Sequence, residues 1–157
     1  MARSELGFDL TPPTPEKLRL LAEKLDPEAR RILLDHGTEP PFCGKFDEYE
    51  EEGLYTCALC ALPLFSSRAK FHSGSGWPSF YQGVGEGHIR YLRDVSHGMV
   101  RTEIRCGRCD SHLGHVFEDG PRPTGLRYCL NSVAMDFVPD GQALPDPLER
   151  DDPSAIG

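Results

Sequence analysis

Apolar residues recur at helical spacing near the start of the chain. Leu18, Leu21, Ala22 and Leu25 form one such stripe. Thr14-Pro15 is a typical helix start, because threonine caps the first turn and proline suits its first position. Asp26-Pro27 repeats this signal, and Gly37 suits a helix end. We therefore expect two short helices that cover the core and carry no chemistry.

From Gly53 onward the pattern changes to short segments with a period of two, separated by glycine, proline, aspartate and serine. Between residues 99 and 106, the side chains at even positions alternate with Arg101, Glu103 and Arg105, which is typical of a half-buried strand. The expected strands are Leu54–Cys57, Ile89–Asp94, Met99–Cys106, His112–Phe117 and Arg127–Val138. Strand following strand predicts a mainly β, largely antiparallel domain with short N-terminal helices.

A chain of 157 residues suits a single domain with its own hydrophobic core. We expect a core at about 37–138, an N-terminal helical segment at 12–36, and a polar tail at 139–157 that follows the surface or lacks order. The net charge of −8 disfavours nucleic acid and anionic membranes as partners. No stretch is apolar enough to span a bilayer, and acidic residues stand where a signal peptide would be apolar. These features predict an intracellular, cytoplasmic protein.

Four of the six cysteines form two C-x-x-C pairs, Cys57 with Cys60 and Cys106 with Cys109. Four thiolates at about 2.3 Å suit tetrahedral Zn²⁺ and leave no open position, so the predicted zinc is structural. Iron is a weaker option, because sulfur ligands alone do not exclude it. The same spacing would also suit two redox dithiols or two disulfides, although a reducing compartment disfavours a disulfide scaffold.

Cys43 and Cys129 remain outside these pairs. On a strand, Arg127, Cys129 and Asn131 would point to one face. A neighbouring guanidinium favours the nucleophilic thiolate, and the amide could hold a substrate or a water. The alternative is an inert cysteine in a core strand.

Two further segments could complete a site. His112 and His115 would lie on opposite faces of a regular strand, but Gly114 permits a bulge that brings them together. Either could donate a proton at neutral pH, or could instead be a metal ligand or a structural histidine. Trp77 lies in the glycine-rich segment 73–80 and could form one wall of an apolar pocket, or belong to the core.

Taken together, these segments resemble the type B, or R-selective, methionine sulfoxide reductases. The resemblance runs from about His36 to Phe137 and rests on the cysteine pairs and on four motifs, at 73–80, 112–117, 119–121 and 127–132. It implies two small antiparallel sheets stapled by one structural Zn²⁺. It also implies an oxidoreductase that repairs methionine R-sulfoxide under oxidative stress, with oxidised proteins or peptides as preferred substrates and thioredoxin as reductant.

The resemblance also implies a role for each site residue. Cys129 attacks the sulfoxide and becomes a sulfenic acid. His112 and His115 hold or protonate the sulfoxide oxygen, with His115 as the acid, and Asp119 supports that histidine. The remaining predicted residues are Arg127 and Asn131 on the polar side and Trp77 and Phe117 for substrate binding.

The sequence departs from this family at two positions. Many relatives carry a resolving cysteine where this chain has Ser75, so we expect Cys43 to form the disulfide with Cys129. The alternative is direct reduction of the sulfenic acid by an external thiol. His72 stands where relatives commonly have aspartate, either beneath Trp77 or on the surface.

We expect a monomer. A zinc-knuckle binding module and a cysteine hydrolase are the rival functions.

Overall fold

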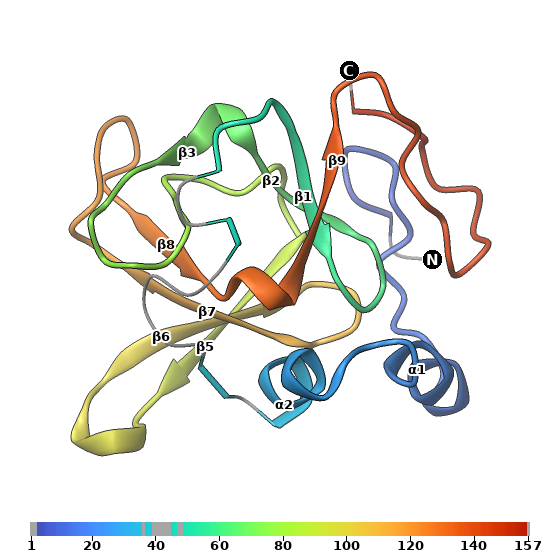
Figure 1. Ribbon diagram of the computed structural model, residues 1–157, viewed down its shortest axis with the longest axis horizontal. Coiled ribbons are helices and arrows are strands. Elements are labelled where there is room, and N and C mark those ends of the chain that lie inside the picture. Colours follow the sequence, from blue (N-terminus) through green and yellow to red (C-terminus); the bar gives the residue numbers. More distant parts are fainter. Residues whose placement is uncertain (1–2, 36, 39–44, 47–48, 157) are drawn as a thin grey trace.

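Two antiparallel β-sheets form the body of the molecule, with two α-helices beside them (Figure 1). The computed structural model describes residues 3–35, 37–38, 45–46 and 49–156. The three-stranded sheet has the order β2 (Pro63–Ser66), β1 (Gly53–Cys57), β9 (Met135–Pro139). The six-stranded sheet has the order β3 (Lys70–Phe71), β4 (Ser79–Phe80), β8 (Arg127–Leu130), β7 (His112–Phe117), β6 (Arg101–Cys106), β5 (Ile89–Asp94). The predicted mainly β fold with two sheets is confirmed.

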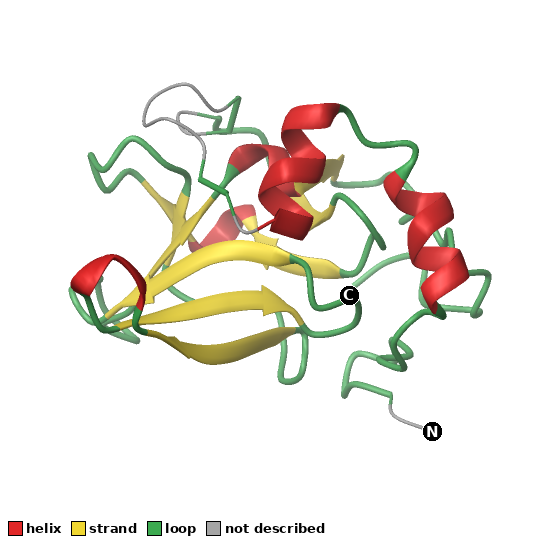
Figure 2. Ribbon diagram, turned by 90° about the horizontal axis from the view of Figure 1, so that it is seen from below, coloured by secondary structure: helices red, strands yellow, loops and turns green. Residues whose placement is uncertain are grey.

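Both predicted helices are present, and each begins at its predicted cap. In α1 (Pro15–Ala22), the Thr14 hydroxyl accepts the N–H of Lys17 at 3.2 Å. In α2 (Pro27–Asp35), the Asp26 carboxylate accepts the N–H of Ala29 at 2.8 Å. These caps satisfy N–H groups that have no partner inside the helix. The helices lie along the lower edge of the molecule in Figure 1, and Figure 2 shows them in red from below.

One predicted strand was wrong. The segment 127–138 is not continuous, because β8 ends at Leu130 and β9 begins at Met135 in the other sheet. Between them the chain turns through the 3₁₀-helix Ser132–Ala134. The turn is held at Asn131, whose backbone N–H and side-chain amide both donate to the Leu113 carbonyl, at 3.0 and 3.1 Å. The strand period alone does not reveal this local hydrogen bonding. The short strands β2, β3 and β4 were not predicted.

Aromatic side chains fill the space between the sheets. Tyr55 of β1 and Phe65 of β2 face Phe80 of β4 and Tyr128 of β8. Phe65 stacks on Phe80 with ring centroids 4.5 Å apart, and Tyr55 meets Phe80 edge-on at 5.0 Å. Each such pair contributes about 0.5–1.5 kcal/mol beyond its buried area. This core fixes β4 and β8, which carry the site described below.

The C-terminal segment after β9 lies against the body of the molecule. After β9 it runs beside the N-terminal segment, at the right of Figure 1. Leu144 is buried against the core, and its N–H donates to the Ser154 carbonyl at 2.8 Å. The tail is therefore packed at particular points, although its sequence is polar.

Candidate active site and metal centre

Cys129 lies on an interior strand of the six-stranded sheet. In β8 it is paired with Ser79 of β4 on one side and with His115 of β7 on the other. His115 is in turn paired with Glu103 of β6. Residues directly opposite one another in antiparallel strands share a face. The four side chains therefore form a row across the sheet, with the half-buried Cys129 within it.

A pocket of about 270 Å³ opens at this row. Its lining residues are Thr38, Ser75, Trp77, Arg101, Gly114, His115, Phe117, Arg127, Cys129, Leu130 and Asn131. Six of the predicted site residues thus meet in one pocket that has an aromatic side and a polar side. His112 and Asp119 do not line it, and Cys43 lies outside the described residues.

Arg127 stands between the aromatic and polar parts of the pocket. Its guanidinium lies over the Phe117 ring at 4.4 Å and donates to both oxygens of Asp119, at 2.9 and 3.2 Å. The bond to Asp119 raises the pKa of Arg127, and the neighbouring Cys129 adds to this effect. The predicted support of His115 by Asp119 therefore needs correction: Asp119 orients Arg127. Asp119 begins the turn at 119–126 and Arg127 follows it, so the turn brings the two side chains together.

Asp94, at the end of β5, is the carboxylate that His115 contacts. Its Oδ2 lies 2.8 Å from His115 Nε2 and accepts Nη2 of Arg101 at 3.1 Å. The N–H and hydroxyl of Ser96 donate to Oδ1. The bonds from Ser96 lower the pKa of Asp94 most, followed by the bond from His115. Because the carboxylate is ionised, Nε2–H of His115 is the donor.

His112 forms a second carboxylate–histidine pair behind the first. Its Nδ1 lies 2.7 Å from Glu103 Oε2, and the ring is buried. Burial raises the pKa of Glu103, but the bonds from Arg105 and His112 lower it overall. The pairing of β6 with β7 shifts register between Ile104 and Arg105, and the two histidine rings lie 5.7 Å apart. The bulge thus brings both rings to one side of the sheet.

Sequence reasoning missed Asp94, Arg101 and Glu103. Arg101 and Glu103 belong to the polar alternating positions of a strand that was predicted. Such positions suggested side chains that face solvent rather than residues of a site. The signal that could have found them is the register of β5, β6 and β7, since Glu103 lies opposite His115. A strand pattern alone does not set the register between strands.

Ser75 occupies the position beside the thiol. Its Oγ lies 3.8 Å from Cys129 Sγ, and Ser73 Oγ contacts it from the other side at 2.8 Å. His72, by contrast, is on the surface and pairs with Glu50 at 3.1 Å. Of the two positions considered for His72, the surface is the one observed.

The four paired cysteines converge at one buried point. Their sulfur atoms all lie within 4.8 Å of one another, with Cys57 to Cys109 at 3.6 Å and Cys60 to Cys106 at 3.5 Å. Tetrahedral zinc with bonds of about 2.3 Å requires sulfur atoms about 3.8 Å apart. The observed spacing fits such an ion and is too long for disulfides, whose sulfurs are about 2 Å apart. The geometry of the cluster therefore fits a bound metal ion.

The two C-x-x-C turns have the same backbone form. Cys57 N–H donates to the Leu62 carbonyl, and Cys106 N–H donates to the Ser111 carbonyl, both at 2.9 Å. The residue after each second cysteine, Ala61 or Asp110, has a positive φ, of 67° and 66°. One turn joins β1 to β2 and the other joins β6 to β7. The cysteine cluster thus ties the two sheets together.

Comparison with known proteins agrees with this geometry. The SelR domain family model matches residues 25–139. A peptide methionine sulfoxide reductase MsrB of Xylella fastidiosa (strain M23) is 59% identical over 145 residues, covering 92% of this chain and 94% of the relative. A protein of the same name from Caulobacter vibrioides (strain NA1000 / CB15N) is 57% identical over 149 residues, covering 95% and 94%.

The chain belongs to the SelR family, whose members here carry the name MsrB, the type B methionine sulfoxide reductases. The family resemblance inferred from the motifs is therefore confirmed. In the described part of the chain, no helix is long and apolar enough to cross a membrane.

Proposed function

We propose that this protein reduces methionine R-sulfoxide to methionine, with Cys129 as the nucleophile. The observation that carries the proposal is the placement of Cys129 in a pocket that also holds Trp77, His115 and Arg127. The family membership supports it, and so does the name of the relatives. A zinc-knuckle binding module would not need this pocket. A cysteine hydrolase would need donors placed for a carbonyl oxygen, whereas the family points to sulfur chemistry.

In the first step the thiol of Cys129 takes the oxygen of the sulfoxide. The Arg127 guanidinium favours the thiolate, which attacks the sulfoxide sulfur while His115 protonates the oxygen. His115 holds Asp94 through Nε2, so we assign the proton transfer to Nδ1. Trp77 and Phe117 would contact the methyl group, and Asn131 would complete the polar side. The hydroxyl then moves from the methionine sulfur to the Cys129 sulfur as the bond between the two sulfurs breaks, so methionine leaves and Cys129 is left as a sulfenic acid.

In the second step a thiol converts the sulfenic acid into a disulfide and releases water. Cys43 is the proposed source of this thiol, because the described cysteines other than Cys129 all belong to the metal cluster. Thioredoxin then reduces the Cys129–Cys43 disulfide by thiol–disulfide exchange and becomes oxidised itself. Direct attack of an external thiol on the sulfenic acid is the alternative second step.

We further propose that the cysteine cluster holds one structural Zn²⁺. The sulfur spacing and the burial of all four cysteines support this assignment. Four sulfur ligands leave no position for a substrate, so zinc would act on stability and not on the sulfoxide.

The cellular setting follows from the same proposal. Thioredoxin as reductant and cysteines kept for metal and catalysis suit a reducing cytoplasm. A pocket that opens at the surface suits methionine sulfoxide within oxidised proteins or peptides, and we expect a monomer. Equal kcat/KM values for free and peptide-bound methionine sulfoxide would contradict the substrate preference.

The decisive experiment is the reduction of a racemic blocked methionine sulfoxide with thioredoxin, with the unreacted epimers resolved. We expect selective loss of the R epimer, no reaction with Cys129→Ser, and one turnover only with Cys43→Ser. Sustained thioredoxin-driven cycling by Cys43→Ser would support the external thiol instead. A folded, zinc-containing parent protein that reduces neither epimer would overturn the proposed function.

A further inference from the structure

Arg108 lies within the second C-x-x-C turn, yet it binds the cysteine of the first. Its side chain is only 1% exposed. The Nε donates to Cys60 Sγ at 3.5 Å, and Nη2 donates to the Cys60 backbone carbonyl at 2.7 Å. A buried guanidinium is costly unless negative partners surround it. One such partner is therefore a sulfur atom of the metal cluster.

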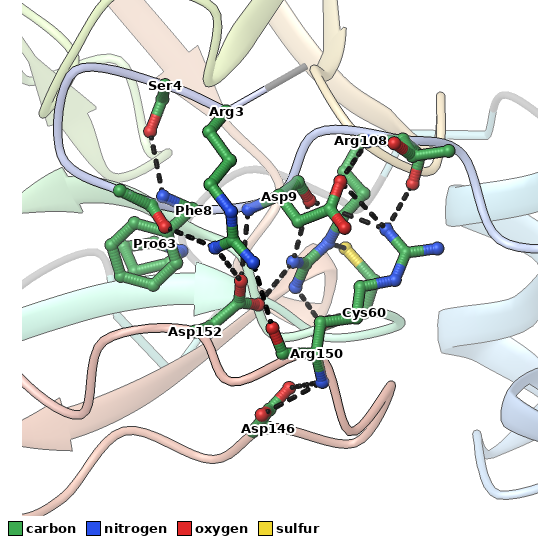
Figure 3. Close-up of polar contacts among 12 residues, drawn as sticks. Arg3, Ser4, Phe8, Asp9, Cys60, Pro63, Arg108, Asp146, Arg150 and Asp152 are labelled. Atoms are coloured by element: carbon green, nitrogen blue, oxygen red, sulfur yellow. Dashed lines mark hydrogen bonds and ion pairs between the residues drawn. The ribbon is translucent and has the colours of Figure 1, made fainter. Parts of the chain in front are cut away.

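The other partners of Arg108 come from the two ends of the chain (Figure 3). Nη1 donates to Asp152 Oδ2 at 2.6 Å and to the Asp9 carbonyl at 3.2 Å. The Asp152 side chain is 3% exposed, and its Oδ1 accepts the N–H of Asp9 at 3.0 Å. Asp152 thus holds both the guanidinium and the N-terminal segment in one orientation.

Further bonds fasten the two ends to each other. Arg150 Nη1 donates to the carbonyls of Asp9 and Thr11, and Arg3 Nη2 donates to the Arg150 carbonyl at 3.2 Å. The Arg150 N–H is held in turn by the Asp146 carboxylate at 3.1 Å. We call segments 3–12 and 144–154 together the terminal clamp. Figure 3 shows its side chains converging on Arg108 and Cys60 from both ends.

A second contact joins the clamp to the same turn. His88 is fully buried, with its ring between the Pro63 carbonyl at 2.7 Å and the Ser4 hydroxyl at 2.8 Å. Its backbone carbonyl accepts the N–H of Gly107 at 2.8 Å. The N-terminal segment therefore reaches the turn at two places, through Arg108 and through His88.

We propose that Arg108, oriented by Asp152, is an outer-sphere residue of the zinc centre and that the terminal clamp slows zinc release. The inference rests on the proposed zinc and does not depend on the reaction at Cys129. Zinc with four thiolates carries net negative charge, which a hydrogen-bonded cation disperses. Release requires a ligand sulfur to leave the metal, and the guanidinium holds Cys60 Sγ in place and covers it. Outer-sphere partners of metal ligands typically change metal affinity by about 10–100-fold.

The test is the rate of zinc transfer from the full-length protein to a chromogenic chelator, together with zinc content. Asp152→Asn keeps the shape of the side chain and removes its charge. We expect transfer about tenfold faster or more, in line with typical outer-sphere effects. Arg108→Lys keeps the charge but loses the planar fork that reaches Cys60 and Asp152 together, so it should show the same change.

Asp110→Asn is the matched control. Asp110 is next to Cys109 and pairs with Arg90 and Arg105, at 2.7 and 3.2 Å, but its side chain is 45% exposed. The substitution removes the same charge near the cluster without any contact to Cys60, so transfer should stay within about twofold of the parent. Far-ultraviolet circular dichroism checks that each variant is folded.

Two outcomes would overturn the inference. Parent-like transfer rates in folded Asp152→Asn would show that the clamp does not retain zinc, even if Arg108→Lys fails to fold. A parent protein that binds no zinc would overturn the metal assignment and the clamp together. Faster zinc transfer in Asp152→Asn and Arg108→Lys, but not in Asp110→Asn, would support the inference.

Discussion

At the scale of single residues, the neighbour of Cys129, the proposed nucleophile, is a serine in this chain. Ser75 Oγ lies 3.8 Å from Cys129 Sγ. The family resemblance implies that this is the position of the resolving cysteine in many relatives. A sulfur atom there would already be within reach of Cys129.

We therefore expect Ser75→Cys to restore turnover when Cys43 is absent. The double variant Cys43→Ser with Ser75→Cys should cycle with thioredoxin, whereas Cys43→Ser alone should stop after one turnover. Mass spectrometry of the oxidised double variant should detect a peptide pair linking residues 75 and 129. Ser73→Cys is the control, because the Ser73 hydroxyl is bonded to Ser75 and Ser79. Equal cycling by the Ser73→Cys double variant would argue against the proximity mechanism.

The Asp94 carboxylate should contribute to stability in a pH-dependent way. Its bonds from Ser96 and His115 hold its pKa below the ordinary value of an unfolded chain. Its contribution is therefore fully present above the unfolded pKa, near pH 4, and is lost as the pH falls through the folded value. The melting temperature of Asp94→Asn should lie below that of the parent at pH 7, and the difference should shrink toward pH 3. A difference that grows on acidification would contradict this.

At the scale of elements, the strand pattern predicted where most strands run but not how they pair. The helices were predictable because Thr14 and Asp26 cap them locally. The break at Asn131 depends on a carbonyl of another strand, Leu113, and the strands β3 and β4 contain only two residues each. Register and very short strands are tertiary properties, which explains why the sequence did not indicate Glu103 and Asp94. The motifs did indicate Cys129, His115 and Arg127, which line one pocket.

Gly114 shows how closely β7 and β8 approach. A side-chain carbon there would lie 2.0 Å from the Cys129 carbonyl oxygen, so Gly114→Ala must move one strand. We expect a loss of about 1–3 kcal/mol in the free energy of unfolding, as for other overpacked sites, and a fall in kcat. Chemical denaturation and steady-state kinetics would measure both. Gly83→Ala is the milder control, because its nearest contact is a flexible Ile89 side chain at 3.3 Å.

At the scale of the whole molecule, the cysteine cluster links the sheets in addition to the aromatic core between them. Structural zinc contributes about 10 kcal/mol or more in small zinc-binding peptides, which is comparable with the total stability of a typical domain. The existence of the four-cysteine site was predictable, because two matched pairs occur in one chain. The terminal clamp was not, since a buried partner such as Asp152 looks like any other residue of a polar tail.

Cys106→Ser should therefore lose its metal and its fold together. We expect less than one zinc per chain by elemental analysis and no cooperative melting transition. Cys129→Ser, which removes a thiol outside the cluster, should keep both. A Cys106→Ser protein with full zinc content and the melting temperature of the parent would refute the structural role.

The strand that carries Cys129 is hydrogen-bonded on both sides, by β4 and by β7. Pairing on both sides restricts movement of the strand, so in the proposed reaction Cys129 would stay in place. The proposed substrate, second thiol and reductant would each have to reach Cys129 in its pocket. A second thiol could therefore come from any segment of the chain that reaches this pocket, which is compatible with the role proposed for Cys43.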